Sequence, residues 1–178
     1  KTACELPIVL KAALMPDAHL GYGLPIGGVL ATDPNTVIPG AIGVDIGCQM
    51  RLTIYYPTQN FTKEGKLIQA LQRKTRFGTN TFQQKFDHKI MDHPDWNSHK
   101  ILRECKDHAW KQLGTSGDGN HFVEFGNYFR KNTIQLEESL RKHTPWALLS
   151  HSGSRNTGYK IANHYIKIAK DKHPELQD

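Results

Sequence analysis

Apolar residues in this chain occur in short runs that polar and glycine-rich segments separate. The first run, residues 6–14, is rich in leucine, isoleucine and valine and predicts a buried strand. The next segment, residues 15–28, holds four glycines and two prolines, which exclude a regular helix and predict an ordered loop before a short strand at 29–31. Further apolar or alternating runs predict strands over residues 37–46, 50–56, 121–125 and 145–150.

Helical periodicity occurs in three segments, at residues 62–73, 98–113 and 157–172. Thr62 is expected to cap the first of them. The apolar side chains predicted to face inward are Leu67, Ile68, Leu71, Ile101, Leu102, Cys105, Ala109, Leu113, Ile161, Tyr165, Ile168 and Ala169. Residues 77–97 are polar and predict a long loop or insertion. The mixture predicts one compact α/β (α+β mixed) domain over 1–178, with mixed sheets and flanking helices.

Composition narrows the class of protein. The chain has 178 residues, of which 38% are hydrophobic, a size that suits one domain. The formal charge of +6 favours anionic partners such as RNA or nucleotides, although a solvated basic surface is the simple alternative. Three cysteines at irregular spacing predict a reduced, cytoplasmic setting. No apolar run is long enough to predict a membrane span, and no signal peptide is expected.

The segment at residues 43–48 places a carboxylate and a thiol three residues apart between glycines. Asp45 and Cys48 are both good metal ligands when deprotonated, and His121 and His151 lie in similar Gly- or Ser-rich settings. All but Asp45 fall at predicted strand ends, which hold side chains rigidly beside open loops. The four residues predict a buried metal centre, against the alternative of a turn Asp, a small buried Cys and structural histidines.

Two further segments carry candidate chemistry. The serines after His151, together with Arg155 and a helix N-terminus, favour phosphate binding, with simple helix capping as the alternative. Asp17 and His19 lie in the Gly-rich loop and are candidates for orienting ligands or contacting substrate. These residues together indicate a metal-dependent enzyme acting on phosphates. Thiolate favours zinc, whereas the carboxylate and imidazole also admit manganese or iron.

Four segments then resemble, in order, the signature motifs of the RtcB family of tRNA-splicing RNA ligases. They span residues 15 to 158 and read MPDAHLGYGLPIGG, GAIGVDIGCQM, LGTSGDGNHFVE and HSGSRNTG. The resemblance implies the N-terminal part of an RtcB-like fold. It also implies joining of RNA 2′,3′-cyclic-phosphate or 3′-phosphate ends to 5′-hydroxyl ends, in tRNA splicing or RNA repair. GTP and two Mn²⁺ ions are the implied cofactors, and tRNA halves the implied RNA.

By the same resemblance, Cys48 bridges the two Mn²⁺ ions. Asp45 and His121 complete one metal site, and His151 belongs to the other. The guanylate-binding residues implied are Asn120, His121, Phe122 and Glu124. The residues implied in catalysis are Asp17 and His19, which line the active site, and Arg155, which contacts phosphate or RNA. The resemblance also implies a protein partner that activates the ligase.

One departure from the family affects the expected activity. Two further histidines, one a metal ligand and one the guanylylated nucleophile, follow the HSGSR motif in the family, and we expect neither among these 178 residues. The chain is therefore expected to be a fragment that binds metal weakly and does not ligate alone. Two alternatives are a metal-dependent phosphoesterase of RNA ends, with Asp17 or His19 as general base, and a non-catalytic RNA-binding remnant.

Overall fold

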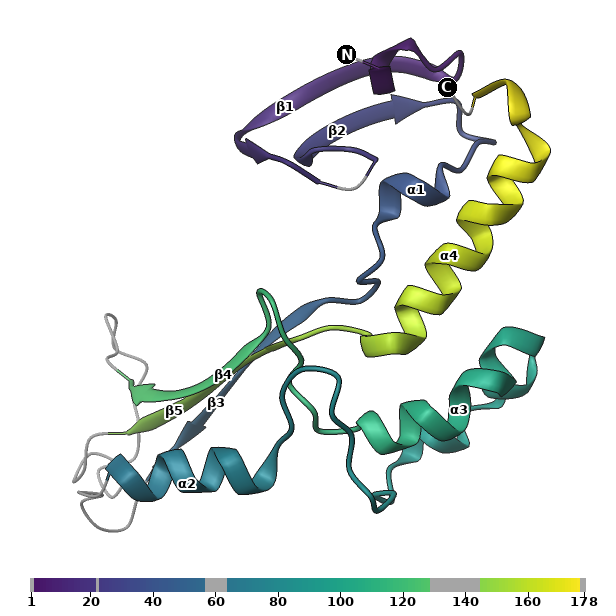
Figure 1. Cartoon of the computed structure of the whole chain (residues 1–178). Helices are drawn as coiled ribbons and strands as arrows, with labels where there is room; N and C mark the ends of the chain where they lie inside the picture. The colour runs from purple at the N-terminus through teal and green to yellow at the C-terminus, as the bar shows by residue number, and fades with distance from the viewer. Residues whose placement is uncertain (1, 22, 57–63, 129–144, 177–178) are drawn as a thin grey trace. The chain divides into compact units, whose positions relative to one another are not determined.

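The N-terminal apolar run forms one strand of an antiparallel hairpin in the computed structural model, which describes residues 2–21, 23–56, 64–128 and 145–176 (Figure 1). β1 (Val9–His19) pairs with β2 (Ile26–Thr32). The strand continues through Pro16, which lies in a segment that the sequence predicts as a loop. The pairing register shifts between Leu14 and His19, so Pro16 interrupts no regular ladder of backbone hydrogen bonds. The prediction that this strand is buried is wrong, since Leu14 is 69% exposed.

The strand predicted over residues 37–46 is also wrong. Its centre forms the short helix α1 (Pro39–Ile42). Pro39 stands at the first helical position, where its fixed φ suits a helix and its missing N–H costs nothing. Gly43 follows and ends the helix with a φ of +83°, a backbone conformation that glycine adopts readily and residues with side chains rarely adopt.

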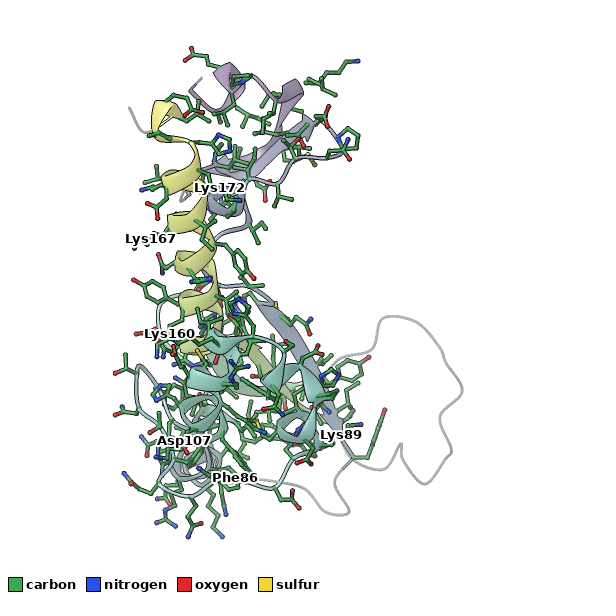
Figure 2. The ribbon with its side chains drawn as sticks, turned by 90° about the vertical axis from the view of Figure 1, so that its right-hand side faces the viewer. Phe86, Lys89, Asp107, Lys160, Lys167 and Lys172 are labelled. Carbon is green, nitrogen blue, oxygen red and sulfur yellow. The ribbon has the colours of Figure 1, made fainter. Side chains whose placement is uncertain are left out.

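The C-terminal helix is confirmed as α4 (Arg155–Lys172). Its buried residues are the small Gly158 and Ala162, whereas Tyr165 and Ile168 are 44% and 37% exposed, contrary to the inward face predicted for them. The lysines labelled on this helix in Figure 2 are Lys160, Lys167 and Lys172.

A second sheet contains three antiparallel strands in the order β3 (Gln49–Tyr55), β5 (Trp146–Ser152) and β4 (Phe122–Asn127). β5 is therefore the central strand, hydrogen-bonded on both sides. Helix α2 (Glu64–Lys74) contacts β4. The predicted cap of that helix, Thr62, lies outside the described residues. Two small antiparallel sheets with flanking helices confirm the mixed α/β class.

The segment predicted as a long polar loop or insertion, residues 77–97, contributes buried residues to the core. It forms two 3₁₀ helices, η2 (Lys89–Asp92) and η3 (Pro94–Asn97), and the second contacts α3 (Lys100–Gln112). Met91 in η2 is 1% exposed and Cys105 in α3 is 2% exposed. The indole Nε1 of Trp110 donates to the carbonyl of Phe86 at 2.6 Å, which ties the segment to α3.

One surface carboxylate on α3 titrates away from its ordinary range. Hydrogen bonds from Lys85 and Lys111, reinforced by their charge, hold the pKa of Asp107 below its usual 3.8 (Figure 2). The stabilisation by these pairs is present above that usual value and is lost as the pH falls through the lower, folded-state value. All three side chains are exposed, so salt screens the pairs.

The chain divides into two compact units, residues 1–46 with 156–178 and residues 47–155. The single-domain organisation predicted from the sequence stays a prediction. No helix in the part of the chain that the structure describes has the length and apolar character needed to cross a membrane.

Candidate metal centre

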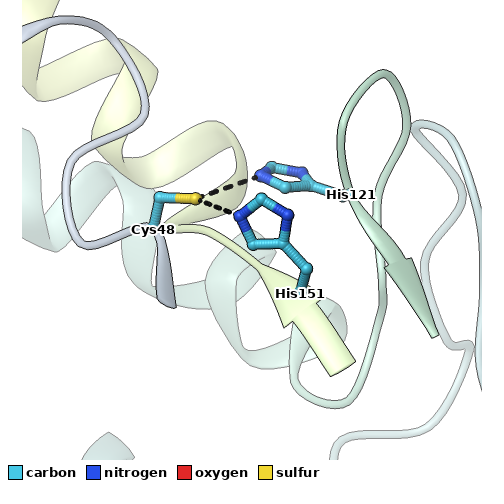
Figure 3. A group of neighbouring side chains, drawn as sticks. All are labelled: Cys48, His121 and His151. Atoms are coloured by element: carbon cyan, nitrogen blue, oxygen red, sulfur yellow. Dashed lines mark hydrogen bonds between the residues drawn. The ribbon is translucent and has the colours of Figure 1, made fainter. Parts of the chain in front are cut away.

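Three of the four predicted metal ligands converge in the second unit. The Sγ atom of Cys48 lies 2.8 Å from Nε2 of His151 and 3.8 Å from Nε2 of His121 (Figure 3). One donor atom from each of the three residues falls within 4.8 Å of the other two. Cys48 is exposed and the histidines are partly buried, so an ion can reach the cluster from solvent.

The register of the three-stranded sheet explains why these residues meet. His151 on the central strand lies directly opposite Met50 on β3 and Phe122 on β4. Cys48 comes immediately before β3, and His121 comes immediately before β4. Because both outer strands run antiparallel to β5, their starting ends flank the same end of β5, and the residues that precede them meet around His151.

A backbone hydrogen bond fixes which nitrogen of His151 is available to a metal. Nδ1 of His151 lies 2.7 Å from the carbonyl oxygen of Asn120. A carbonyl only accepts, so Nδ1 carries the proton, and the Nε2 lone pair of the neutral ring faces Cys48. Such a bond to the far ring nitrogen is typical of metal-ligating histidines.

The donor set and its spacing fit a divalent transition metal. Ligand atoms on a tetrahedral ion lie about 3.6 Å apart, given metal–sulfur and metal–nitrogen bonds of about 2.3 and 2.1 Å. The 3.8 Å separation of Cys48 and His121 agrees with that value, and the 2.8 Å contact with His151 requires only a small opening. A thiolate and two neutral imidazoles suit zinc, copper or iron, and a carboxylate ligand would widen the choice to manganese.

Arg155 lies at the start of α4, in a conformation that non-glycine residues rarely adopt. Its φ is +53°, and its guanidinium donates to the carbonyl of Gly78, 77 residues away in sequence. Its Nε atom is buried and has no hydrogen-bond partner among the described residues. The strained backbone is therefore held in place by the surrounding contacts, as is common at functional sites.

The strain at Arg155 leads to a testable prediction. Arg155→Gly and Arg155→Ala both lose the guanidinium contact, but only glycine adopts a positive φ without cost. We expect the glycine variant to be more stable than the alanine variant by about 1 kcal/mol. Urea unfolding of the two variants measures the difference, and equal midpoints would show that Arg155 is not held at positive φ.

The other candidate residues divide between the two units. The Phe122 ring packs edge-on against the His151 ring, with 5.6 Å between centroids. Glu124, two residues further along β4, points to the same face of the sheet. Asp17, His19 and Asp45 belong to the first unit, and their roles beside the cluster stay predictions.

His19 lies at the end of β1, where its Nδ1 hydrogen-bonds the carbonyl of Asp17 at 2.7 Å, rather than in the loop expected from sequence.

Sequence reasoning missed the residues that support the cluster. The hydroxyl of Ser152, beside His151, donates to the carbonyl of Ser116 at 2.7 Å, and the N–H of Ser116 donates to Arg76 at 2.8 Å. These bonds tie the end of β5 to the turn before β4. They join segments at least 36 residues apart, so no local pattern in the sequence indicates them.

The chain is similar to one family of known proteins along its whole length. The family model "tRNA-splicing ligase RtcB" matches residues 1–96 and 86–178. The RNA-splicing ligase RtcB of Escherichia coli (strain K12) is 33% identical over 189 residues, which cover 96% of this chain and 43% of that protein. The tRNA-splicing ligase RtcB of Nanoarchaeum equitans is 30% identical over 207 residues, which cover 94% of this chain and 43% of that protein.

A third relative, RNA-splicing ligase RtcB homolog 1 of Entamoeba histolytica, is 30% identical, with 92% of this chain and 38% of that protein covered. The chain thus spans about two fifths of the length of the curated relatives it matches.

Proposed function

The chain belongs to the RtcB family, and we propose that it forms the metal-binding part of the active centre of a GTP-dependent RNA ligase. The observation that supports this proposal is the Cys48, His121 and His151 cluster, whose residues fall within the matched family region. The reaction proposed is joining of RNA 2′,3′-cyclic-phosphate or 3′-phosphate ends to 5′-hydroxyl ends. The substrates proposed are tRNA halves or broken RNA in the cytoplasm, with or without an activating protein partner.

We propose that Cys48, His121 and His151 would hold Mn²⁺ and that Asp45 would supply a further carboxylate ligand. Bound divalent ions neutralise the charge on phosphate oxygens during nucleotidyl transfer. The chain's own contribution is orientation. The Asn120 carbonyl fixes the His151 tautomer, and the strand ends hold Cys48 and His121 at the end of β5 that carries His151.

The reaction proposed has three steps that begin from the 3′-phosphate, and a 2′,3′-cyclic phosphate is first opened by water to that 3′-phosphate. A histidine displaces pyrophosphate from GTP and becomes guanylylated, the GMP passes to the RNA 3′-phosphate, and the 5′-hydroxyl displaces GMP to form the phosphodiester. We propose that Phe122 and Glu124 contact the guanine, because both point to the sheet face that carries His151. We propose that Arg155 contacts an RNA phosphate, a role that suits a guanidinium, and that Asp17 and His19 line the same active centre.

The proposal is tested with two RNA fragments, one ending in a 3′-phosphate and one beginning with a 5′-hydroxyl. The whole protein, given GTP and Mn²⁺, is expected to produce joined RNA, and residues 1–178 alone are expected to bind Mn²⁺ without joining. Gel separation of labelled RNA measures joining. The expectation for the isolated chain follows from the family nucleophile, which lies outside the motifs matched here.

The same mixture distinguishes the alternatives. Release of inorganic phosphate, or opening of a cyclic phosphate without GTP, would contradict the ligase and support a phosphoesterase. RNA binding that weakens with salt but is unchanged by chelation of the metal would support an RNA-binding module instead.

A further inference from the structure

In the turn before β4, Gly117 lies against the side chains of His121 and Arg155. At Gly117, a Cβ atom would lie 2.7 Å from Nδ1 of His121 and 2.9 Å from Cζ of Arg155, and it would overlap the Nη1 atom of Arg155. Real Cβ atoms essentially never come within 3.0 Å of another heavy atom. The imidazole of His121 and the guanidinium of Arg155 therefore both lie close to the Cα atom of Gly117, which carries no side chain.

Backbone hydrogen bonds hold Gly117 and the residue before it in place. The carbonyl of Gly117 accepts the N–H of Gly78 at 2.8 Å, and the residue forms an isolated β-bridge with Phe77. The preceding residue, Ser116, is 2% exposed and bonds Arg76 and Ser152 through its backbone. A side chain at 117 would therefore displace its neighbours and not the turn.

The neighbours differ in how freely they can move. Arg155 donates to the carbonyl of Gly78, which itself bonds Gly117, so its guanidinium is confined from two sides. The His121 ring has Nδ1 toward Gly117 and Nε2 toward Cys48. A push at Nδ1 therefore changes the position of the nitrogen that faces the thiol, 3.8 Å away.

We propose that Gly117 is a positioning residue, whose missing side chain sets the place of His121 in the metal cluster and of Arg155 beside it. The proposal rests on the proposed function only in giving His121 a metal to bind. It couples the two groups through one backbone atom, so a substitution at 117 disturbs a metal ligand and a phosphate-binding candidate together. Sequence alone shows Gly117 only as one of several glycines in a turn.

The chain offers a matched control two residues away. Gly119 also has a positive φ, +65°, but a Cβ there meets no heavy atom within 4 Å. Gly117→Ala and Gly119→Ala thus both strain the same turn, and only the first contacts His121 and Arg155. The readout that distinguishes them is the position of the His121 ring, measured by ¹H–¹⁵N spectra of histidine side chains in the metal-free protein and assigned with His121→Asn.

Gly117→Ala is expected to shift the His121 signals and to lower the affinity for Co²⁺ about 10-fold or more, in the range known for residues that orient ligands. Gly119→Ala is expected to leave both close to the unsubstituted protein. Equal His121 signals in the two variants would overturn the proposal. Failure of the unsubstituted chain to bind Co²⁺ would overturn the proposed function while leaving the ring-position result to decide this one.

A second variant keeps the test decisive where Gly117→Ala alone does not fold. Combining it with Arg155→Ala removes the guanidinium overlap and leaves the contact with His121. The double variant is expected to fold, to shift the His121 signals, and to bind Co²⁺ less tightly than Arg155→Ala alone. His121 signals that match those of Arg155→Ala would overturn the proposal.

Discussion

Replacing Cys48 by alanine is expected to lower the affinity of the chain for Co²⁺ at least about 100-fold and to remove the thiolate-to-cobalt charge-transfer band. Cys48 is the residue that both histidines face, at 2.8 and 3.8 Å, so its loss leaves two imidazoles and no thiolate in the cluster. Residues that merely orient a ligand contribute 10–100-fold to metal affinity, and a direct ligand is expected to exceed that. Optical titration with Co²⁺ measures both effects.

Cys4 provides the control for that experiment. It is an exposed free cysteine and is not one of the three residues of the cluster, so Cys4→Ala removes a thiol and keeps all three. The Cys4→Ala variant is expected to keep the affinity and the charge-transfer band. A Cys48→Ala variant that still shows thiolate-to-cobalt absorption would mean that another cysteine holds the metal, and the cluster would then not be the site.

The candidate ligands could be found from sequence because their local settings are unusual. Cys48 directly follows Gly47, and His121 follows a Gly-rich turn, and such places beside apolar runs are typical of strand ends. The sequence predicts that these residues meet with His151 in a metal centre, but it does not indicate how. Their meeting depends on β5 lying between β3 and β4, and no local pattern indicates this sheet order. The support from Ser152 and Gly117 was missed for the same reason.

Strand predictions failed where local backbone preferences outweighed the apolar pattern. Residues 37–46 have β-branched character, but Pro39 and Gly43 favour a short helix with a defined stop. In β1, the apolar run predicts burial, yet Leu10 and Leu14 are 68% and 69% exposed. Periodicity indicates which residues share a face, but not what covers that face.

The sequence also misses the burial of two residues within 77–97, although most of the segment is irregular as predicted. The polar composition of the segment predicted a loop, but Met91 in this segment is 1% exposed, and Phe82 is 8% exposed. Only a few apolar side chains are needed to anchor a short 3₁₀ helix, and a composition average over the segment hides them. The indole Nε1 of Trp96 donates to the carbonyl of Ile90 at 2.8 Å and holds the two 3₁₀ helices together.

Because the side chain of Met91 is almost fully buried, Met91→Ala is expected to destabilise the second unit strongly. Truncating a fully buried methionine costs about 2–5 kcal/mol, from lost transfer free energy and the cavity left behind. Total stabilities of domains are about 5–15 kcal/mol, so such a loss removes a large share of the free energy of unfolding and is expected to lower the urea midpoint clearly. Urea unfolding followed by tryptophan fluorescence reports the change, since Trp96 and Trp110 lie in the adjoining helices.

Ile90→Ala is the matched control, because Ile90 is the preceding residue of the same 3₁₀ helix and is 45% exposed. Its backbone carbonyl still accepts from Trp96, so only side-chain burial differs between the two variants. We expect Ile90→Ala to cost about 1 kcal/mol or less, in proportion to the smaller apolar area it removes from contact. Equal losses for the two variants would mean that the burial of Met91 does not stabilise this segment and that residues 89–92 do not belong to the core.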